Sequence, residues 1–207
     1  MNTDGIQNFK ELEPNRLVDA LIITIEDQLP GFKDSDEFVD ILAYKKNEDQ
    51  HSTALCVYMN NRCADFCFSR ENNQKGSRTV DIGVYKGSIL FFTIEAKLLP
   101  TPKGSNRNEH EYVYGKGGGI QRFKNNNHGL DNRDNLLNKN GLIAYLKEND
   151  FQYWYQKINQ WIVDANWAES EKLKKNYFNS IAKLQSRHIR KGNSEVILYH
   201  FWIYSTE

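Results

Sequence analysis

The sequence predicts an α/β protein in which helices flank a central mixed β-sheet. A β-branched and aromatic hairpin covers residues 79–98, an apolar stripe with helical spacing covers 15–29, and a β-rich run covers 196–204. Strand and helix patterns that alternate in this way are typical of a sheet with helices packed on it. We expect the sheet to be built around residues 66–98 and to be completed by residues 196–204.

Length and composition indicate one folded, soluble domain. The 207 residues can bury one core, so we predict a single domain over 1–207. No apolar run approaches the roughly 18 residues needed to span a membrane. The N-terminus lacks a signal-peptide pattern, which predicts a cytoplasmic protein with reduced cysteines. The spacing of Cys56, Cys63 and Cys67 with His51 matches no standard zinc site.

The N-terminal third is expected to be helical. Pro30-Gly31 ends the first helical stripe, and Ser35 before residues 36–42 is typical of an N-cap. Residues 53–59 are ambiguous, and we favour a helix there. The apolar positions of the first stripe are Val18, Leu21, Ile22, Ile25 and Leu29.

Charged side chains interrupt the hairpin. Residues 64–69 are predicted to form the first strand and 71–78 a polar connection, before strands at 79–85 and 89–98. Because side chains alternate along a strand, Glu95 and Lys97 point the same way. Asp81 adds a third charge on the neighbouring strand. Such charges are costly to bury unless they are paired or bind a charged ligand.

These residue types suit phosphodiester hydrolysis. Two converging carboxylates are hard oxygen ligands for Mg²⁺ or Mn²⁺, and a nearby lysine can orient a water or neutralise a phosphate. The alternative without catalytic function is a hairpin that ends in an ordinary Glu-Lys ion pair on the surface.

The order of these residues resembles the PD-(D/E)xK nuclease superfamily, which includes many restriction and repair endonucleases. Asp81, thirteen intervening residues and then Glu95-Ala96-Lys97 carry the resemblance, which covers mainly residues 66–124. It implies a restriction endonuclease-like core with added helices. It also implies that Asp81, Glu95 and the Ala96 carbonyl hold the metal while Lys97 assists the water. Val80 stands where that family usually has Pro.

An additional acid often joins the metal site in that superfamily. Glu26, beside the first helical stripe, and Glu71, at the end of the first predicted strand, are the two candidates. Each is equally well explained as a solvated acid.

A glycine-rich segment follows the hairpin. Gly117-Gly118-Gly119 runs into a predicted helix that carries Gln121, in the order in which many superfamily members place a Gln near the metal. Basic residues outnumber acidic ones from 97 to 124, which favours a phosphate backbone. Lys116, Arg122 and Lys124 are the expected nucleic-acid contacts, although a mixed surface loop could show the same excess.

The C-terminal half carries weaker signals. Residues 125–140 are expected to be an Asn-rich loop that closes over the substrate, with His128 as a weak candidate for a phosphate or proton contact. Apolar residues from 142 to 162 predict two helices whose aromatic stripe packs in the core. Residues 169–185 are predicted to form another helix, and 187–191 a small basic cluster.

The expected activity is therefore Mg²⁺-dependent endonuclease cleavage, with DNA as substrate by analogy and a role in defence against foreign DNA consistent with it. One alternative is a catalytically silent nucleic-acid or protein-binding module on the same fold. Another is a small-molecule enzyme, such as a nucleotide phosphohydrolase, that uses a metal on the same carboxylates. Cleavage of both strands by one site per chain would require two events or a homodimer.

Overall fold

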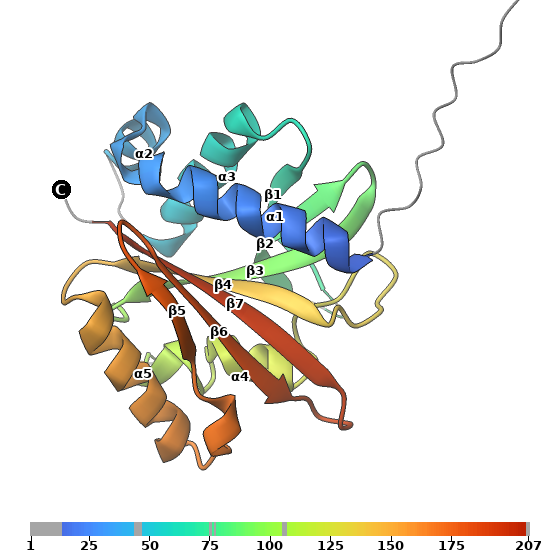
Figure 1. Cartoon of the computed structure of the whole chain (residues 1–207), viewed down its shortest axis with the longest axis vertical. Coiled ribbons are helices and arrows are strands. Elements are labelled where there is room, and N and C mark those ends of the chain that lie inside the picture. The colour runs from blue at the N-terminus through green and yellow to red at the C-terminus, as the bar shows by residue number, and fades with distance from the viewer. Residues whose placement is uncertain (1–13, 44–46, 75, 77, 105–106, 206–207) are drawn as a thin grey trace, which may run out of the picture.

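A seven-stranded mixed sheet forms the centre of the protein (Figure 1). The computed structural model describes residues 14–43, 47–74, 76, 78–104 and 107–205. In spatial order the strands are β1 (Cys67–Asn73), β2 (Thr79–Lys86), β3 (Ile89–Leu99), β4 (Lys139–Leu146), β7 (Glu195–Tyr204), β6 (Ala182–Ile189) and β5 (Lys174–Phe178). The predicted α/β class, with a mixed sheet flanked by helices, is confirmed.

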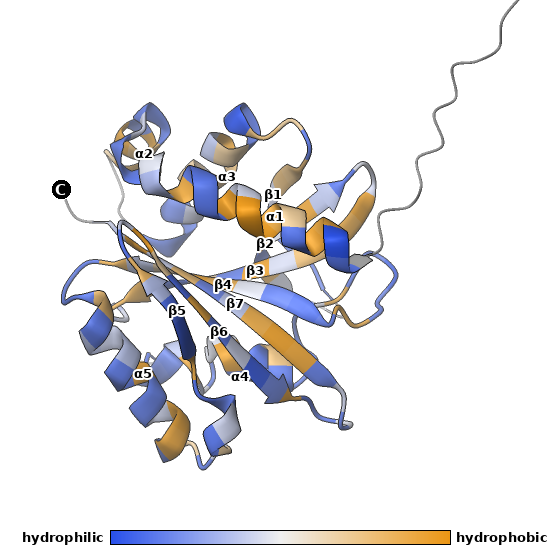
Figure 2. Ribbon diagram, viewed as in Figure 1, coloured by the Kyte–Doolittle hydropathy of each residue, from blue (hydrophilic) through white to orange (hydrophobic). Residues whose placement is uncertain are grey.

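The middle of the sheet is parallel and its two sides are antiparallel. β4 pairs in parallel with both β3 and β7, whereas β1, β2 and β3 form an antiparallel meander on one side and β7, β6 and β5 another. Parallel strands need both faces covered. Accordingly, β4 is almost entirely buried, while edge strand β5 is hydrophilic in Figure 2 and exposes Lys174 and Lys175.

Two helical layers cover the sheet. One face packs against α1 (Pro14–Gln28), η1 (Leu29–Asp34), α2 (Asp36–Leu42) and α3 (Glu48–Arg62). The other face packs against η2 (Glu109–Tyr112), α4 (Gly119–Lys124), α5 (Phe151–Asp164) and η3 (Glu169–Glu171). Because strand side chains alternate, Ile94, Ala96 and Leu98 join the first core while Leu99 joins the second.

Most of the predicted N-terminal elements are confirmed. The first stripe forms α1, residues 53–59 lie inside α3, and the hairpin forms β2 and β3. The hydroxyl of Ser35 accepts a hydrogen bond from the Phe38 amide at 3.2 Å, so it caps α2 as expected. The last β-rich run forms β7, which is an inner strand of the sheet.

Two helix predictions in the C-terminal half are wrong. Residues 142–146 belong to strand β4, so only α5 remains of the two helices expected from 142 to 162. A short apolar run that is buried on both faces has no periodicity to separate strand from helix. Residues 169–185 contain η3, β5 and the start of β6 instead of a helix. β6 buries alternate residues from Ala182 to His188, which is a strand period.

The Asn-rich segment is mainly loop, as predicted, but it is tied firmly to the sheet. Residues 129–137 form a small turn, in which the Leu137 amide donates to the Gly129 carbonyl at 2.7 Å. The buried side chain of Asn140 accepts from the Thr93 hydroxyl at 2.8 Å and donates to the Leu137 carbonyl at 2.8 Å. Asn140 therefore fixes this turn to β3. Separately, no helix in the described ranges is long and apolar enough to cross a membrane.

We predict that Asn140→Ala lowers the free energy of unfolding by about 1 to 3 kcal/mol, because it leaves the buried Thr93 hydroxyl without its partner and removes one of the two side-chain hydrogen bonds to the Leu137 carbonyl. Urea denaturation followed by circular dichroism measures the change. The matched control is Asn138→Ala, whose exposed side chain should contribute less than about 0.5 kcal/mol. Equal losses for the two variants would contradict the role given to Asn140.

Candidate active site

The sheet splits between β2 and β3 beside the predicted acidic residues. The two strands pair up to Ile82 and Ile94, but β2 residues before Ile82 stay with β1, where Val80 pairs with Asn72. Beyond Ile94, the edge of β3 that faces β2 is therefore left open. Unpaired strand amides at such an edge need other acceptors.

Two carboxylates from different elements supply those acceptors. Asp81 Oδ2 accepts from the Ala96 amide at 2.7 Å, and Glu48 Oε2 accepts from the Leu98 amide at 3.1 Å. The amide and carbonyl of one strand residue point to the same edge, so the Ala96 carbonyl also faces the split. The split thus gathers carboxylate and carbonyl oxygens, which are hard ligands.

Glu95 and Lys97 lie on the sheet face that carries α4, and they pair with each other. Lys97 Nζ is 2.8 Å from Glu95 Oε1, and Arg122 Nη1 of α4 is 2.5 Å from the same oxygen. Lys97 Nζ also lies 3.5 Å from Glu48 Oε1. Residues just before Ile82 and just after Ile94 share a face, so Asp81 belongs to the same face as Glu95. The structure thus gathers the three charges predicted from the hairpin.

Solvent reaches this group unevenly. Glu95 is 0% exposed and Lys97 4% exposed, whereas Asp81 is partly exposed. The Arg122 side chain keeps 34% of its surface accessible. Entry to the site is therefore by way of Asp81 and Arg122, with Glu95 and Lys97 behind them.

The second oxygen of Glu95 lacks an aligned partner. Glu95 Oε2 lies 3.0 Å from His128 Nδ1, but the contact does not have hydrogen-bond geometry, and both atoms are buried. A buried carboxylate oxygen without a good hydrogen bond is costly. His128, only a weak candidate in the sequence, thus lies directly against the central acid of the site.

The pKa values of the three central groups are shifted. Burial and then the charge of Glu95 raise the pKa of Asp81 to about 7. Burial opposes ionisation of Glu95, but the charge of Lys97, the close contact with His128 and the charge of Arg122 outweigh it and hold the Glu95 pKa below its usual range. Burial likewise opposes the charged form of Lys97, yet the surrounding Glu95, Glu48 and Asp81 raise its pKa. Asp81 is the group that titrates near neutral pH.

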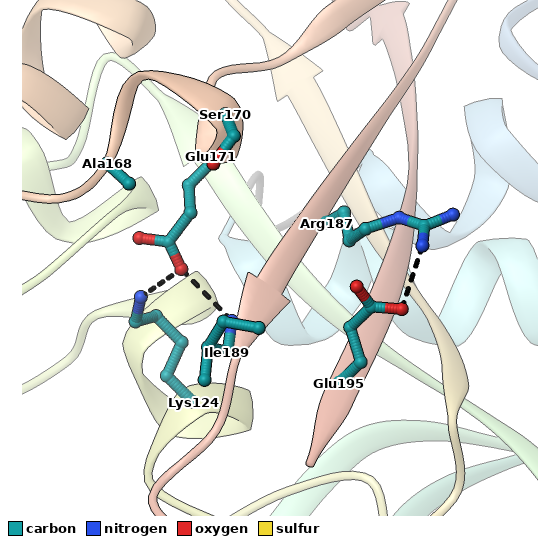
Figure 3. Close-up of a pocket in the computed structure, with 7 residues that line it drawn as sticks. All are labelled: Lys124, Ala168, Ser170, Glu171, Arg187, Ile189 and Glu195. Carbon is teal, nitrogen blue, oxygen red and sulfur yellow. Dashed lines mark hydrogen bonds and ion pairs between the residues drawn. The ribbon is translucent and has the colours of Figure 1, made fainter. Parts of the chain in front are cut away.

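The predicted residues of the glycine-rich loop and α4 have different surroundings. Gln121 Oε1 accepts from the Gly115 amide at 2.8 Å, so the side chain holds the glycine-rich loop. Lys116 is exposed. Arg122 binds Glu95, as described above. Lys124 is ion-paired with Glu171, which also accepts from the Ile189 amide at 3.1 Å in a separate pocket on the α4 side (Figure 3).

A further acid of the cluster is Glu48 at the start of α3, a residue that the sequence analysis did not single out. Glu26 pairs with Lys183, and the Glu71 carboxylate lies 3.4 Å from Arg70 Nη2, so neither predicted acid lies in the cluster formed by Asp81, Glu95 and Lys97. Glu48 occupies that place. Asn47 caps the helix there by accepting from the Gln50 amide at 2.9 Å, and an acid directly after such a cap is a recognisable helix start.

The donor set fits a hard divalent cation better than a zinc-type site. Across the described ranges, no three His, Cys, Asp or Glu side chains gather in a metal-binding arrangement. Mg²⁺ in proteins uses one or two carboxylates and keeps several waters. The unsatisfied Glu95 Oε2 and the mutual repulsion of Asp81 and Glu95 are features that a bound cation would relieve.

Comparisons with protein-family models, curated proteins and solved structures give no match. What this site does must therefore be argued from its own geometry.

The raised pKa of Asp81 predicts a pH-dependent stability difference. A carboxyl whose pKa is higher in the folded than in the unfolded state stabilises the protein below about pH 4, and this contribution is lost as the pH rises to about 7. The Asp81→Asn variant has no ionisable group at this position, so its stability does not fall for this reason as the pH rises. In EDTA, we expect the variant to become progressively more stable than the wild type from pH 4 to pH 7, as measured by urea unfolding. A stability difference that is constant with pH would contradict the raised pKa.

Proposed function

We propose that this protein is a Mg²⁺-dependent nuclease that hydrolyses phosphodiester bonds, with DNA as the favoured substrate. The observation that carries the proposal is the split between β2 and β3, where Asp81 and the Ala96 backbone face each other beside Glu95 and Lys97. This arrangement combines hard oxygen ligands, which suit a divalent cation, with an ammonium group that can neutralise charge on a phosphate.

Asp81, Glu95 and the Ala96 carbonyl would hold the ion, with Glu48 as a further acid beside them. The chemistry that Mg²⁺ would supply there is polarisation of a phosphoryl oxygen and a lower pKa of a bound water, which would then be the nucleophile. Glu95 Oε2 is the oxygen best suited as a ligand, because Oε1 already binds Lys97 and Arg122.

Basic side chains position the reacting groups. Lys97 is held charged by the acids around it and lies at the back of the site, where it can orient a water and neutralise charge on the phosphate. Arg122 is partly exposed and holds Glu95 from the α4 side, so it is suited to contact a phosphate at the entrance. Lys116 on the glycine-rich loop is free to bind the phosphate backbone nearby.

One observation favours a second candidate, a silent module on the same fold. Glu95 is fully buried and is already neutralised by Lys97 and Arg122, with His128 adjacent. A carboxylate held in this way could be purely structural, because a buried charge that is paired with cations needs no metal ion to offset the cost of burial. The nuclease must bind a divalent cation and the silent module need not, so a test of metal binding distinguishes the two candidates.

We predict that the wild-type protein cleaves plasmid or linear DNA in Mg²⁺ or Mn²⁺ but not in EDTA, and that Asp81→Asn lowers the rate by about a hundredfold or more, because it weakens the metal site. Gel electrophoresis and fluorescence-quenched oligonucleotides measure cleavage. Exposed Asp27→Asn on α1, on the opposite helical layer, is the charge-matched control and should keep full activity.

Metal binding itself has a second readout. Mg²⁺ should raise the melting temperature of the wild type and of Asp27→Asn, but not that of Asp81→Asn, because a ligand that binds only the folded state stabilises it. Absence of both cleavage and metal-dependent stabilisation would reject the nuclease proposal and favour the silent module.

A further inference from the structure

A second recess adjoins the candidate active site, and its chemistry differs from that of the site. It has a volume of about 460 Å³, which falls within the range of about 300 to 1,000 Å³ for small-molecule sites. Asn72, Asn73 and Gln74 at the end of β1 form one side. Asp131, Asn132 and Asp134 of the 129–137 turn form the other.

Both sides of the recess continue into the active-site elements. Asn72 pairs directly with Val80, the residue before Asp81. The 129–137 turn follows His128, which lies against Glu95. Gln74 joins the two sides, since its side chain donates to the Leu130 carbonyl at 3.3 Å and accepts from the Leu130 amide at 2.9 Å. The recess therefore borders the elements that carry Asp81 and His128.

The charge of the recess disfavours a phosphate. Its lining includes the carboxylates of Glu71, Asp131 and Asp134 and a single cation, Arg70. Arg70 Nη1 donates to the Thr53 hydroxyl of α3 at 2.7 Å, and its Nη2 lies 3.4 Å from Glu71 Oε1, so it is Oε2 of Glu71 that is left to accept from a ligand. The acids repel anions but accept hydrogen bonds from N–H donors, which they bind more strongly than neutral acceptors do.

Some of the polar groups form a fixed frame and others are open to a ligand. The Asp131 carboxylate accepts from the Arg133 and Asn135 amides at 2.8 and 2.9 Å, and the Asn72 side chain accepts from Tyr85 at 2.7 Å. In contrast, the exposed side chains of Asn73 and Asp134 make no hydrogen bond to another described residue. The frame holds them at the mouth of the recess.

We propose that this recess binds an unstacked nucleobase of the substrate and prefers bases with an exocyclic amine. In this arrangement, which rests on the proposed nuclease function, the carboxylates of Asp134 and Glu71 accept from the amine, and the Asn73 amide contacts the adjacent ring edge. Cytosine, adenine and guanine carry such an amine, whereas thymine offers a carbonyl oxygen at the corresponding position. A carboxylate therefore favours cytosine over thymine among bases of equal size.

The test compares 12-nucleotide single strands of cytosine or thymine by fluorescence anisotropy, with wild-type protein in EDTA so that neither strand is cut. We expect the cytosine strand to bind about tenfold more tightly. The double variant Glu71→Gln, Asp134→Asn should lower this preference to about twofold or less. It should also bind the thymine strand at least as well as the wild type, because two negative charges are gone. Asn suits position 134 because φ there is 62°.

Asp27→Asn removes one carboxylate elsewhere and should keep the tenfold preference. The inference is overturned if the wild type binds both strands equally, if it binds neither, or if the double variant keeps the preference. These outcomes are distinct from failure of the proposed function, which is judged by Mg²⁺-dependent cleavage. A base preference without cleavage would reject the nuclease and leave the base site standing.

Discussion

The open edge of β3 is the constraint on which the rest of the site depends. β2 pairs with β3 only from Ile82 onward, so Asp81 and the residues before it are not paired with β3. The Ala96 and Leu98 amides must therefore find acceptors other than a strand. Carboxylates of Asp81 and Glu48 meet that need. Placing them there next to Glu95 concentrates negative charge in a low-dielectric region, which is unfavourable without nearby cations. Lys97 and Arg122 offset this charge, and the acidic and basic groups of the site are therefore mutually dependent.

A buried set of polar side chains packs behind the glycine-rich segment. Tyr112 comes just before the glycine-rich loop, and its hydroxyl lies 2.7 Å from His200 Nδ1 and accepts from Trp202 at 2.9 Å. A buried chain continues from His200 through Ser186 to His188, with 2.7 Å contacts on both sides of Ser186. Polar groups that are satisfied within a core specify one arrangement of the elements that carry them. This chain fixes η2 against β6 and β7.

The structural elements that the sequence predicted correctly are those set by interactions between residues close together in the chain. Amphipathic α1, the Ser35 cap and the β2–β3 hairpin follow from local periodicity and turn chemistry, and all were predicted. The strand at 142–146 was missed because a segment that is buried on both faces carries no local period. In the region 169–185, β5 is short and only the first residues of β6 are included, so too little strand alternation is present to exclude a helix.

The sequence by itself determined that Glu95 and Lys97 share a face and that an acid precedes them on the adjacent strand, because alternation along a strand is a local property of the backbone. It also determined the cap and the glycine-rich approach to α4. Only the tertiary structure decided that Glu48, rather than Glu26 or Glu71, lies beside Lys97 in this cluster, and that His128 and Arg122 meet at Glu95. These contacts join residues far apart in the chain, and they exist because the divergence of β2 from β3 and the folding of α3, α4 and the Asn-rich loop onto the sheet bring them to one place.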